Sequence, residues 1–291
     1  MIKYTFLTIV NLFFLIDIGH CQTWWNETHN WDGVTHWSKY LEVSPGFFGP
    51  NALPVPDIKT GALSNTYRFD LAGEYHHSGG DKTQNLFTQL YIPIATDKVG
   101  FNISLVPIEF YDFDMETRDE RAARDFDGEG TAGGDFYVST FIQLLQGHSK
   151  LPDLLLTVNL KTASGTNLEA VRFTDTPGYF FDLSFGKQLN SIRWYGMMGL
   201  YVWQTYEDLS PQNDAFLFGA GLQWKNQLMS IDTQIGGYLG YKQNRDQPIV
   251  ARLELNTLRS KTFNYFARLQ YGLQDFDYSS IRAGISWHFI N

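Results

Sequence analysis

The chain has 291 residues, with 22 Lys and Arg against 31 Asp and Glu, which gives a formal net charge of −9. This acidic balance argues against nucleic acid as a partner, because a phosphate-binding surface requires an excess of basic side chains. Aromatic residues make up 16% of the chain, yet its mean hydropathy is only −0.25. High aromatic content at average hydropathy is typical of transmembrane β-barrels.

The N-terminus has the pattern of a secretory signal peptide. A lysine precedes an apolar stretch from Phe6 to Ile16, and small residues follow near Cys21. The apolar stretch is too short to span a bilayer, which disfavours a signal anchor. We therefore expect residues 1–21 to be removed. Lipidation of the cysteine is the alternative, but it requires a small residue where His20 stands.

Residues 22–62 show no strand-like alternation. Their first part is rich in Trp and His, and "SPGFFGPNALPVPDI" is a Pro/Gly-rich connector of extended conformation. We expect this segment to be periplasmic. It could anchor at the membrane interface, fold into the lumen of a barrel, dock on a partner, or pack as an ordered tail without chemistry.

From Leu63 onward, apolar and polar residues alternate with the period of two that is typical of β-strands. In "TYRFDLAGEYHHS", for example, charged residues share one face and Tyr, Phe and Leu the other. Twelve such segments are predicted, near residues 63–78, 83–95, 100–113, 135–147, 153–165, 178–188, 192–206, 214–225, 228–243, 248–259, 261–275 and 279–290.

The apolar faces carry large aromatics near their ends, whereas the polar faces mix charges with Gly, Ser and Asn. A lipid-facing exterior around a polar lumen explains both faces, and a closed sheet leaves no unpaired backbone in hydrocarbon. The sequence therefore predicts an all-β fold, a transmembrane antiparallel up-and-down β-barrel of about twelve strands over residues 63–291. Pro107 breaks the alternation of the third strand, so we expect a bulge or an edge-like irregularity there.

The connections between the predicted strands alternate in length. "TDKV" and "HSKLP" are short, whereas the connections near residues 115–134 and 164–178 are long. Bacterial barrels have short periplasmic turns and long surface loops, and an even strand number would place both termini in the periplasm. The last segment, "IRAGISWHFIN", resembles the C-terminal signal of bacterial outer-membrane proteins, although its aromatic residue is third from the end. This resemblance implies the bacterial outer membrane.

Strand parity places a set of charged side chains in the lumen. Five are basic and five are acidic, so we expect cross-strand ion pairs that fill a narrow, mostly occluded barrel. These predicted luminal residues are Arg68, Asp70, Glu74, Lys161, Asp182, Asp232, Arg252, Glu254, Arg268 and Arg282.

The stretch "EYHHSGG" could be catalytic. His76, His77 and Ser78 resemble the His-x-Ser corner of outer-membrane phospholipase A and some lipid A deacylases, but Gly79 follows where those families have Asn. The resemblance implies a lipid hydrolase in which His76 is the base for Ser78 and Glu74 orients the histidine. The alternative is that these are polar residues at a strand rim, followed by a surface turn, and their luminal parity favours it.

The third-strand exit and the loop after it are strongly acidic. Asp125, Asp127 and Glu129 have the spacing of the first ligands of a calcium-binding loop. Phe136, however, stands at the twelfth position of that loop, where a bidentate Glu belongs. Arginines are interleaved with these acids, and Glu120 and Arg124 have the spacing of a helical ion pair. A surface loop braced by salt bridges is therefore the competing interpretation.

Two classes of function remain. The first is a non-enzymatic barrel, either an accessory or scaffold subunit of an envelope assembly or a narrow solute channel. The second is the lipid hydrolase. The sequence favours the first, with no cofactor and with outer-membrane lipid as its surroundings. Protein partners could bind through the loops, the lipid face or residues 22–62.

Overall fold

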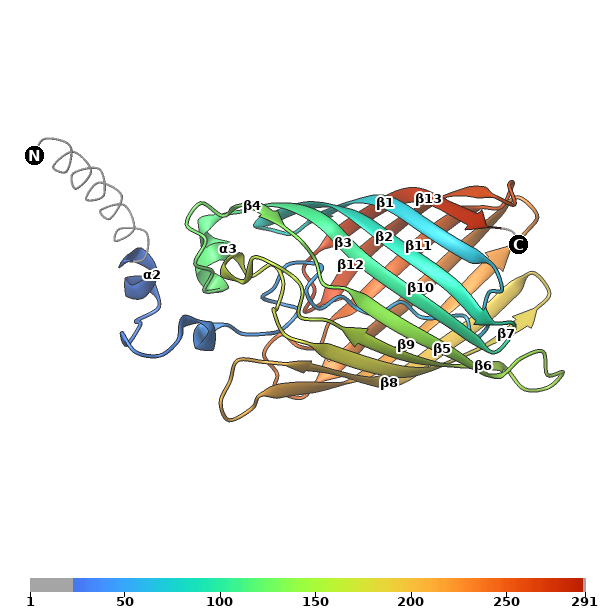
Figure 1. The fold of residues 1–291 in the computed structure, drawn as a ribbon, viewed down its shortest axis with the longest axis horizontal. Coiled ribbons are helices and arrows are strands. Elements are labelled where there is room, and N and C mark those ends of the chain that lie inside the picture. The colour runs from blue at the N-terminus through green and yellow to red at the C-terminus, as the bar shows by residue number, and fades with distance from the viewer. Residues whose placement is uncertain (1–22, 290–291) are drawn as a thin grey trace, which may run out of the picture.

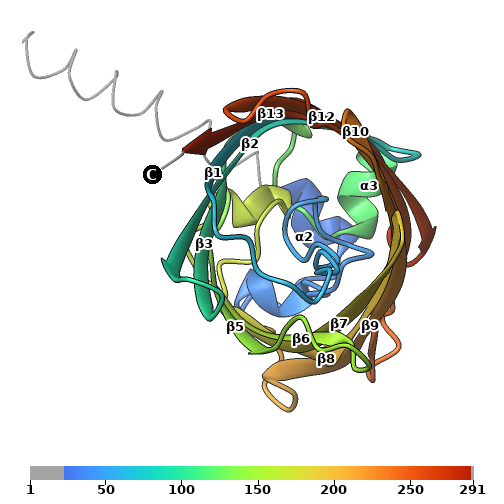
Figure 2. The same cartoon turned by 90° about the vertical axis from the view of Figure 1, so that its right-hand side faces the viewer.

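The computed structural model describes residues 23–289, so the predicted signal peptide lies outside the described residues. Within this range the chain forms a closed antiparallel barrel (Figures 1 and 2). Its twelve described strands are β1 (Tyr67–His77), β2 (Asp81–Ala95), β3 (Val99–Phe113), β5 (Tyr137–Leu145), β6 (Asp153–Lys161), β7 (Gly178–Leu189), β8 (Ile192–Gln204), β9 (Gln212–Lys225), β10 (Met229–Gly240), β11 (Ile249–Thr257), β12 (Phe263–Gln274) and β13 (Ser279–Phe289).

Each barrel strand pairs with its neighbours in the chain, and the ring closes where β1 pairs with β13 as well as with β2. In the closing pair, Tyr67 faces Phe289 and His77 faces Ser279. This closed ring confirms the predicted all-β barrel. The alternation did not predict a short additional strand, β4 (Glu129–Ala132). It pairs with residues 109–112 of β3, whereas β5 pairs with residues 99–104 of the same strand.

Within residues 23–289, four short helical turns lie outside the barrel wall. They are α2 (Thr23–Thr28), η1 (Trp37–Tyr40), α3 (Met115–Glu120) and η2 (Leu168–Ala170). Among the described residues, no helix is both long enough and apolar enough to cross a membrane.

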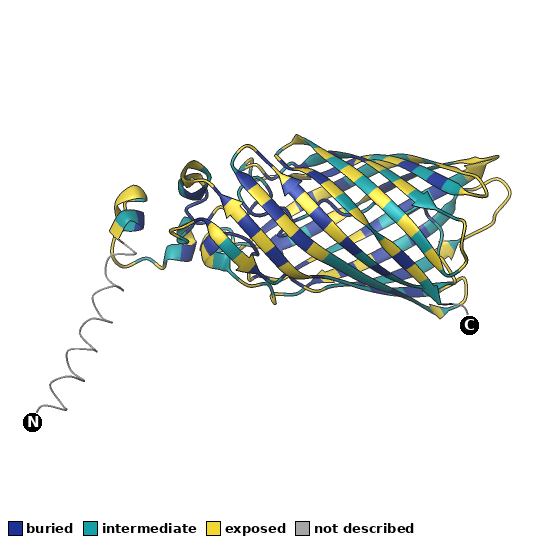
Figure 3. Cartoon of the chain, turned by 90° about the horizontal axis from the view of Figure 1, so that it is seen from above, coloured by how far each residue is buried: buried dark blue, intermediate teal, exposed yellow. Residues whose placement is uncertain are grey.

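Exposed and buried residues alternate over the barrel wall, as Figure 3 shows. On β12, Leu269 is 50% exposed, and on β13 its neighbour Ile281 is 54% exposed, whereas Ser280 is buried. The outer surface thus carries the apolar side chains. This arrangement is the reverse of a soluble protein and matches a wall that faces lipid.

The alternation changes phase at Pro107, where a bulge was expected. Leu86 faces Ile108 and Thr88 faces Leu105, so that Val106 and Pro107 together lie opposite one residue of β2. Asn102 before the bulge and Glu109 after it are both buried, although they are an odd number of residues apart. The bulge allows both ends of β3 to direct the correct side chains inward.

The two ends of the barrel differ. The C-terminal end of the chain and the short turns lie at one end, here called the turn end, whereas α3 and the long connections lie at the other, here called the loop end (Figure 1). Strand β1 starts at the turn end, but α2 and η1 lie beyond the loop end. The intervening segment passes through the lumen (Figure 2).

Strand β1 starts later than the predicted boundary at residue 63. The backbone N–H of Leu63 donates to Gln143 Oε1 at 2.7 Å, and the carbonyl of Ser64 accepts from the Tyr91 hydroxyl at 2.7 Å. Because luminal side chains pair this backbone, it cannot join the strand ladder until Tyr67.

We expect Leu269→Arg to destabilise the folded barrel by about 2–4 kcal/mol in lipid vesicles, because a cation at mid-membrane depth loses its hydration. Leu209, in the loop between β8 and β9, is fully exposed and provides the matched control. Leu209→Arg should change the free energy of unfolding by less than about 0.5 kcal/mol. Equal effects of the two substitutions would contradict a lipid-facing β12.

Candidate functional site: the plugged lumen

Residues 41–62, here called the plug, fill the middle of the barrel (Figure 2). Apolar plug side chains are buried against the wall, and Val43, Phe48, Ala52 and Leu53 are each at most 1% exposed. Burying a large apolar side chain contributes about 1.5–3 kcal/mol. These residues pack in one cluster with wall aromatics that include Tyr201, Trp203 and Tyr238. The N-terminal part of the plug is therefore packed as tightly as a protein core.

Aromatic side chains of the wall also pair the plug backbone. An extended segment without a neighbouring strand leaves its polar groups unpaired, and such groups are costly when buried. Three of the aromatic wall residues donate to plug carbonyls: Trp203 Nε1 to Val43 O at 2.9 Å, Tyr137 OH to Ala52 O at 3.2 Å, and Tyr238 OH to Leu53 O at 2.8 Å.

Basic wall residues hold the C-terminal part of the plug. Arg252 donates to Val55 O at 2.6 Å and Pro56 O at 3.1 Å, and Arg193 donates to Thr60 O at 2.8 Å. Asp57 pairs with Arg268 at 2.9 Å. The plug is thus bonded to strands on several sides of the barrel.

A buried ionic cluster closes the loop end, and it is centred on Arg172 from the connection between β6 and β7. Its guanidinium pairs with Asp81 at 2.6 Å and with Glu109 at 2.7 Å. Asp81 also accepts from Arg121 at 2.6 Å and from the Tyr278 hydroxyl at 2.7 Å. We call these five residues the mouth cluster. They join two long connections to the rim of β2, β3 and β13.

The plug is built into the mouth cluster. Asn51 Nδ2 donates to Glu109 Oε2 at 2.7 Å, and a Cβ at Gly49 would lie 2.8 Å from the Arg172 guanidinium. Burial alone would lower the pKa of Arg172, but the carboxylates of Glu109 and Asp81 outweigh it and raise that pKa. Arg172 therefore remains a permanent cation that both long connections and the plug surround.

The Trp-rich residues before the plug pack on the loop that follows β3. Trp25 is buried and donates from Nε1 to Ala122 O at 2.9 Å. The Arg118 guanidinium lies 3.8 Å from the ring centroid of Trp24, and Arg124 lies 5.3 Å from that of Trp37. Three of the four tryptophans in residues 23–40 therefore pack on this loop, while Trp31 donates from Nε1 to Thr35 O at 2.7 Å.

The ten predicted luminal charges all lie on the inner wall, but they form only part of the expected network. Three pairs join members of the set: Arg68–Asp70 at 2.9 Å, Arg282–Glu74 at 2.5 Å and Arg268–Glu254 at 2.6 Å. Two further cations pair outside the set, Arg252 with Asp57 at 3.4 Å and Lys161 with Asp135 at 2.6 Å.

Asp182 and Asp232 form no ion pair within the described range. Ser184 donates to Asp182 at 2.7 Å, and Tyr195 and two glutamines donate to Asp232. Sequence parity located these side chains on the inner face. It could not identify their partners, because several partners belong to the plug or to long connections.

The candidate catalytic residues do not form the arrangement that the resemblance implies. His76 Nδ1 contacts Ser280 Oγ at 2.7 Å, while Ser78 Oγ lies 3.5 Å from the carbonyl of Asp81. Glu74 accepts from Arg282 and from Asn85 Nδ2 rather than from the histidine.

The tautomer of His76 follows from its neighbours. Because Asn85 Nδ2 donates to Glu74, the Asn85 Oδ1 atom faces His76 Nε2 at 2.9 Å and must accept its proton. Nδ1 then accepts from the Ser280 hydroxyl. Since this chain of hydrogen bonds satisfies both ring nitrogens and bridges β13, β1 and β2, it braces the strand rim.

The carboxylates of the acidic loop after β3 do not converge on a common site. Asp125 accepts from the Tyr111 hydroxyl at 2.6 Å, whereas Asp127 and Glu129 are exposed. No group of three or more His, Cys, Asp or Glu side chains in residues 23–289 is placed to hold a metal ion. The expected pair of Glu120 and Arg124 is wrong, because α3 ends at Glu120. Instead, Glu120 pairs with Arg245 at 2.7 Å and Arg124 approaches Glu169 at 4.0 Å.

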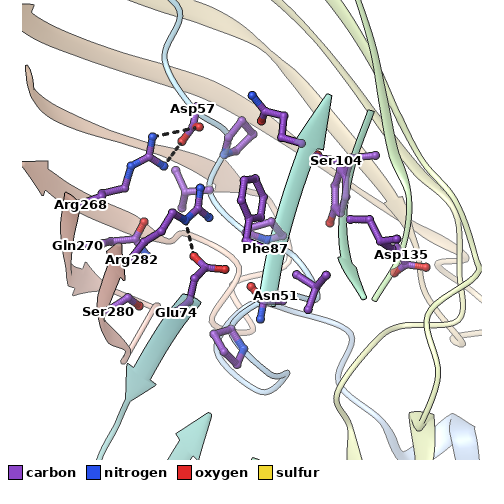
Figure 4. Close-up of a pocket in the computed structure, with 18 of the residues that line it drawn as sticks. Asn51, Asp57, Glu74, Phe87, Ser104, Asp135, Arg268, Gln270, Ser280 and Arg282 are labelled. Atoms are coloured by element: carbon purple, nitrogen blue, oxygen red, sulfur yellow. Dashed lines mark hydrogen bonds and ion pairs between the residues drawn. The ribbon is translucent and has the colours of Figure 1, made fainter. Parts of the chain in front are cut away.

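A cavity of about 290 Å³ lies at the loop end beside Pro45 and Gly46 of the plug. Within the described residues, two further cavities lie deeper in the lumen, beside residues 50–64. One, of about 160 Å³, lies at mid-barrel among Glu74, Phe87, Arg282 and plug residues (Figure 4). The other, of about 240 Å³, lies nearer the turn end beside Leu63 and Arg68. Both are lined by Asp57, Lys59, Gln89, Asn102 and Arg268. Sequence reasoning did not select Asp57 or Lys59, because a Pro-rich connector shows no alternation.

Comparison with known proteins gives the fold. No protein-family model and no curated protein matches the chain. An outer-membrane channel from Pseudomonas putida F1 is similar in structure, with 13% identity, a TM-score of 0.55, and coverage of 85% of this chain and all of that one. The NanC porin matches at 11% identity and a TM-score of 0.49, over 75% of this chain and 98% of that one. The KdgM porin matches at 9% identity and a TM-score of 0.48, over 76% and 99%.

We expect Arg172→Met to lower the free energy of unfolding by about 3–5 kcal/mol, because it leaves Asp81 and Glu109 buried without their main cation. Arg259, exposed in the turn after β11, provides the matched control. Arg259→Met should be neutral in the same denaturant titration. A neutral Arg172→Met would show that the mouth cluster does not hold the loop end together.

Proposed function

We propose that this bacterial outer-membrane β-barrel is kept closed by its own N-terminal segment and acts as an accessory or scaffold subunit of an envelope assembly. The plug carries the proposal, because it passes through the whole lumen with its apolar residues buried and its backbone bonded to the wall. An open pore requires a continuous aqueous path. The packed cluster around Phe48 and Leu53 interrupts such a path.

Working surfaces must then lie outside the lumen. Since Trp24, Trp25 and Trp37 pack on the loop after β3, the loop end presents one combined surface of residues 23–40 and the long connections. This surface extends well beyond the barrel rim in Figure 1. It is the part of the protein best placed to bind another envelope protein.

A narrow solute channel is the second candidate, and the two cavities beside the plug favour it. They would lengthen into a path only if the plug moved away from Tyr201, Trp203 and Tyr238. A channel function thus requires a second conformation of the plug, whereas a scaffold function does not.

We further propose that the loop end is extracellular and the turn end periplasmic, because long loops face outward in bacterial barrels. On this arrangement the C-terminus is periplasmic, as expected from the sequence. Residues 23–40, expected in the periplasm, would instead lie outside the cell, because the plug carries the chain from one end of the barrel to the other.

We expect planar bilayers containing the wild-type protein to show little steady conductance. Phe48→Ala combined with Leu53→Ala should produce frequent openings, because it removes two buried side chains from the packed part of the plug. A matched control is Val34→Ala, which truncates an 89% exposed side chain before the plug. Large, stable, ion-selective openings of the wild-type protein would overturn the closed-barrel proposal.

Orientation can be tested with single cysteines and a maleimide that cannot cross the membrane. We expect cysteines at the exposed positions Val34 and Leu209 to react on intact cells, because both lie at the loop end. A cysteine at Lys150, in a turn-end connection, should react only after the outer membrane is permeabilised. Labelling of Lys150→Cys but not Val34→Cys on intact cells would reverse the orientation.

A further inference from the structure

The cavity nearer the turn end differs in chemistry from the packed part of the plug, whereas the mid-barrel cavity is lined by both polar and apolar side chains. Around residues 41–55 the lumen is filled by apolar and aromatic side chains. Around residues 57–64 the plug is flanked by amides, hydroxyls and charged groups, among them Gln89, Gln234 and Arg68. The lumen is thus closed at the loop end and polar toward the turn end.

Every carboxylate that lines these cavities is fully engaged. Each oxygen accepts at least one hydrogen bond or ion pair. Asp57 is paired with Arg268 and Arg252, and Glu74 is paired with Arg282 and Asn85. Asp135 is paired with Lys161 and with the backbone N–H groups of Ser164 and Gly165. Asp232 accepts from Tyr195, Gln223 and Gln234, and Glu254 accepts from Arg268 and Asn256.

The cations are not engaged to the same extent. Arg68 and Arg282 each donate only from Nε, toward Asp70 and Glu74, which leaves the terminal nitrogens of both guanidiniums without a hydrogen-bond partner in residues 23–289. The Arg282 guanidinium also lies 3.8 Å from the Phe87 ring centroid. Lys59 Nζ forms no hydrogen bond or ion pair within the same range and lies 5.7 Å from the Phe141 ring centroid. All three side chains line a cavity, and Lys59 lines both. The site therefore offers free donors with positive charge and no free carboxylate.

Unpaired amide oxygens add a second requirement. Among the described residues, Asn159 Oδ1 beside one cavity and Gln234 Oε1 beside the other have no hydrogen-bond partner, but neither residue borders both cavities. Asn102 is 7% exposed, lines both cavities, and its Oδ1 atom has no partner among the described residues. An unpaired buried acceptor is costly, and a hydroxyl donor would satisfy it.

We propose that these cavities bind a small organic carboxylate that also carries hydroxyl groups. The terminal nitrogens of Arg68 and the Lys59 ammonium bind the carboxylate, since a guanidinium presents paired donors with the geometry of a carboxylate. Asn102 Oδ1 accepts from a ligand hydroxyl. Because the packed plug closes the loop end, the ligand enters from the turn end.

This inference rests on the plug occupying the lumen, since Lys59 belongs to it, but it requires no transport. Different experimental results would contradict the closed-barrel proposal and the ligand-binding proposal. An open barrel would show itself as conductance of the wild-type protein. A wrong assignment of the site would show itself as missing or unselective binding by a protein that does not conduct.

The test is calorimetric titration of the full mature chain in detergent with D-glucuronate, D-glucose and inorganic phosphate. We expect glucuronate to bind, its affinity to fall at least tenfold in Lys59→Gln and in Arg68→Gln, and glucose not to bind because it lacks the charge. Lys150→Gln, which removes an exposed lysine at the same end of the barrel, should bind like the wild type. Circular dichroism and heat-dependent gel mobility would confirm that each variant is folded.

Each of three outcomes would overturn the assignment. The first is no glucuronate binding by the wild-type protein. The second is a loss in Lys150→Gln equal to that in Lys59→Gln, which would indicate a general charge effect. The third is phosphate binding as tight as that of glucuronate, which would indicate a site for a bare oxyanion without a use for Asn102.

Discussion

The structure depends on one constraint, which is that an extended backbone inside a barrel has no neighbouring strand to pair its polar groups. The inner wall meets this constraint with long side chains instead of a ladder. Trp203 and Tyr238 donate to plug carbonyls in the aromatic half, and Arg252 does so in the polar half. The composition of the inner wall is therefore explained by the plug as much as by the barrel.

The same constraint explains why the two ends of the lumen differ. At the loop end, the mouth cluster surrounds Arg172 with carboxylates from the rim, and the plug residue Asn51 completes the coordination of Glu109. Toward the turn end, the plug is held by polar contacts from Arg252, Arg268 and Arg193, and a cavity remains there in addition to the one at mid-barrel. A barrel closed at one end and polar at the other can bind a ligand without conducting it.

The sequence predicted the wall better than its contents. Period-two alternation depends on neighbours two residues apart, so it located twelve strands and even the phase change at Pro107. The plug follows no such rule, because its hydrogen bonds join residues as distant as Val43 and Trp203. His76 illustrates the same limit. Its neighbour Ser78 suggested a catalytic pair, whereas its actual partner, Ser280, lies on the strand that closes the barrel.

The central claim, that the chain passes through its own barrel, is tested most directly by a disulfide between plug and wall. A Cβ at Gly236 on β10 would lie 3.4 Å from Cγ1 of Ile58, so Ile58→Cys with Gly236→Cys brings two thiols within bonding reach. Mild oxidation of native membranes should then convert most of the double variant into a form of altered gel mobility that reductant reverses, while neither single variant changes. Failure to form this bond, together with free reaction of the cysteine at position 58 with a water-soluble maleimide, would contradict the claim.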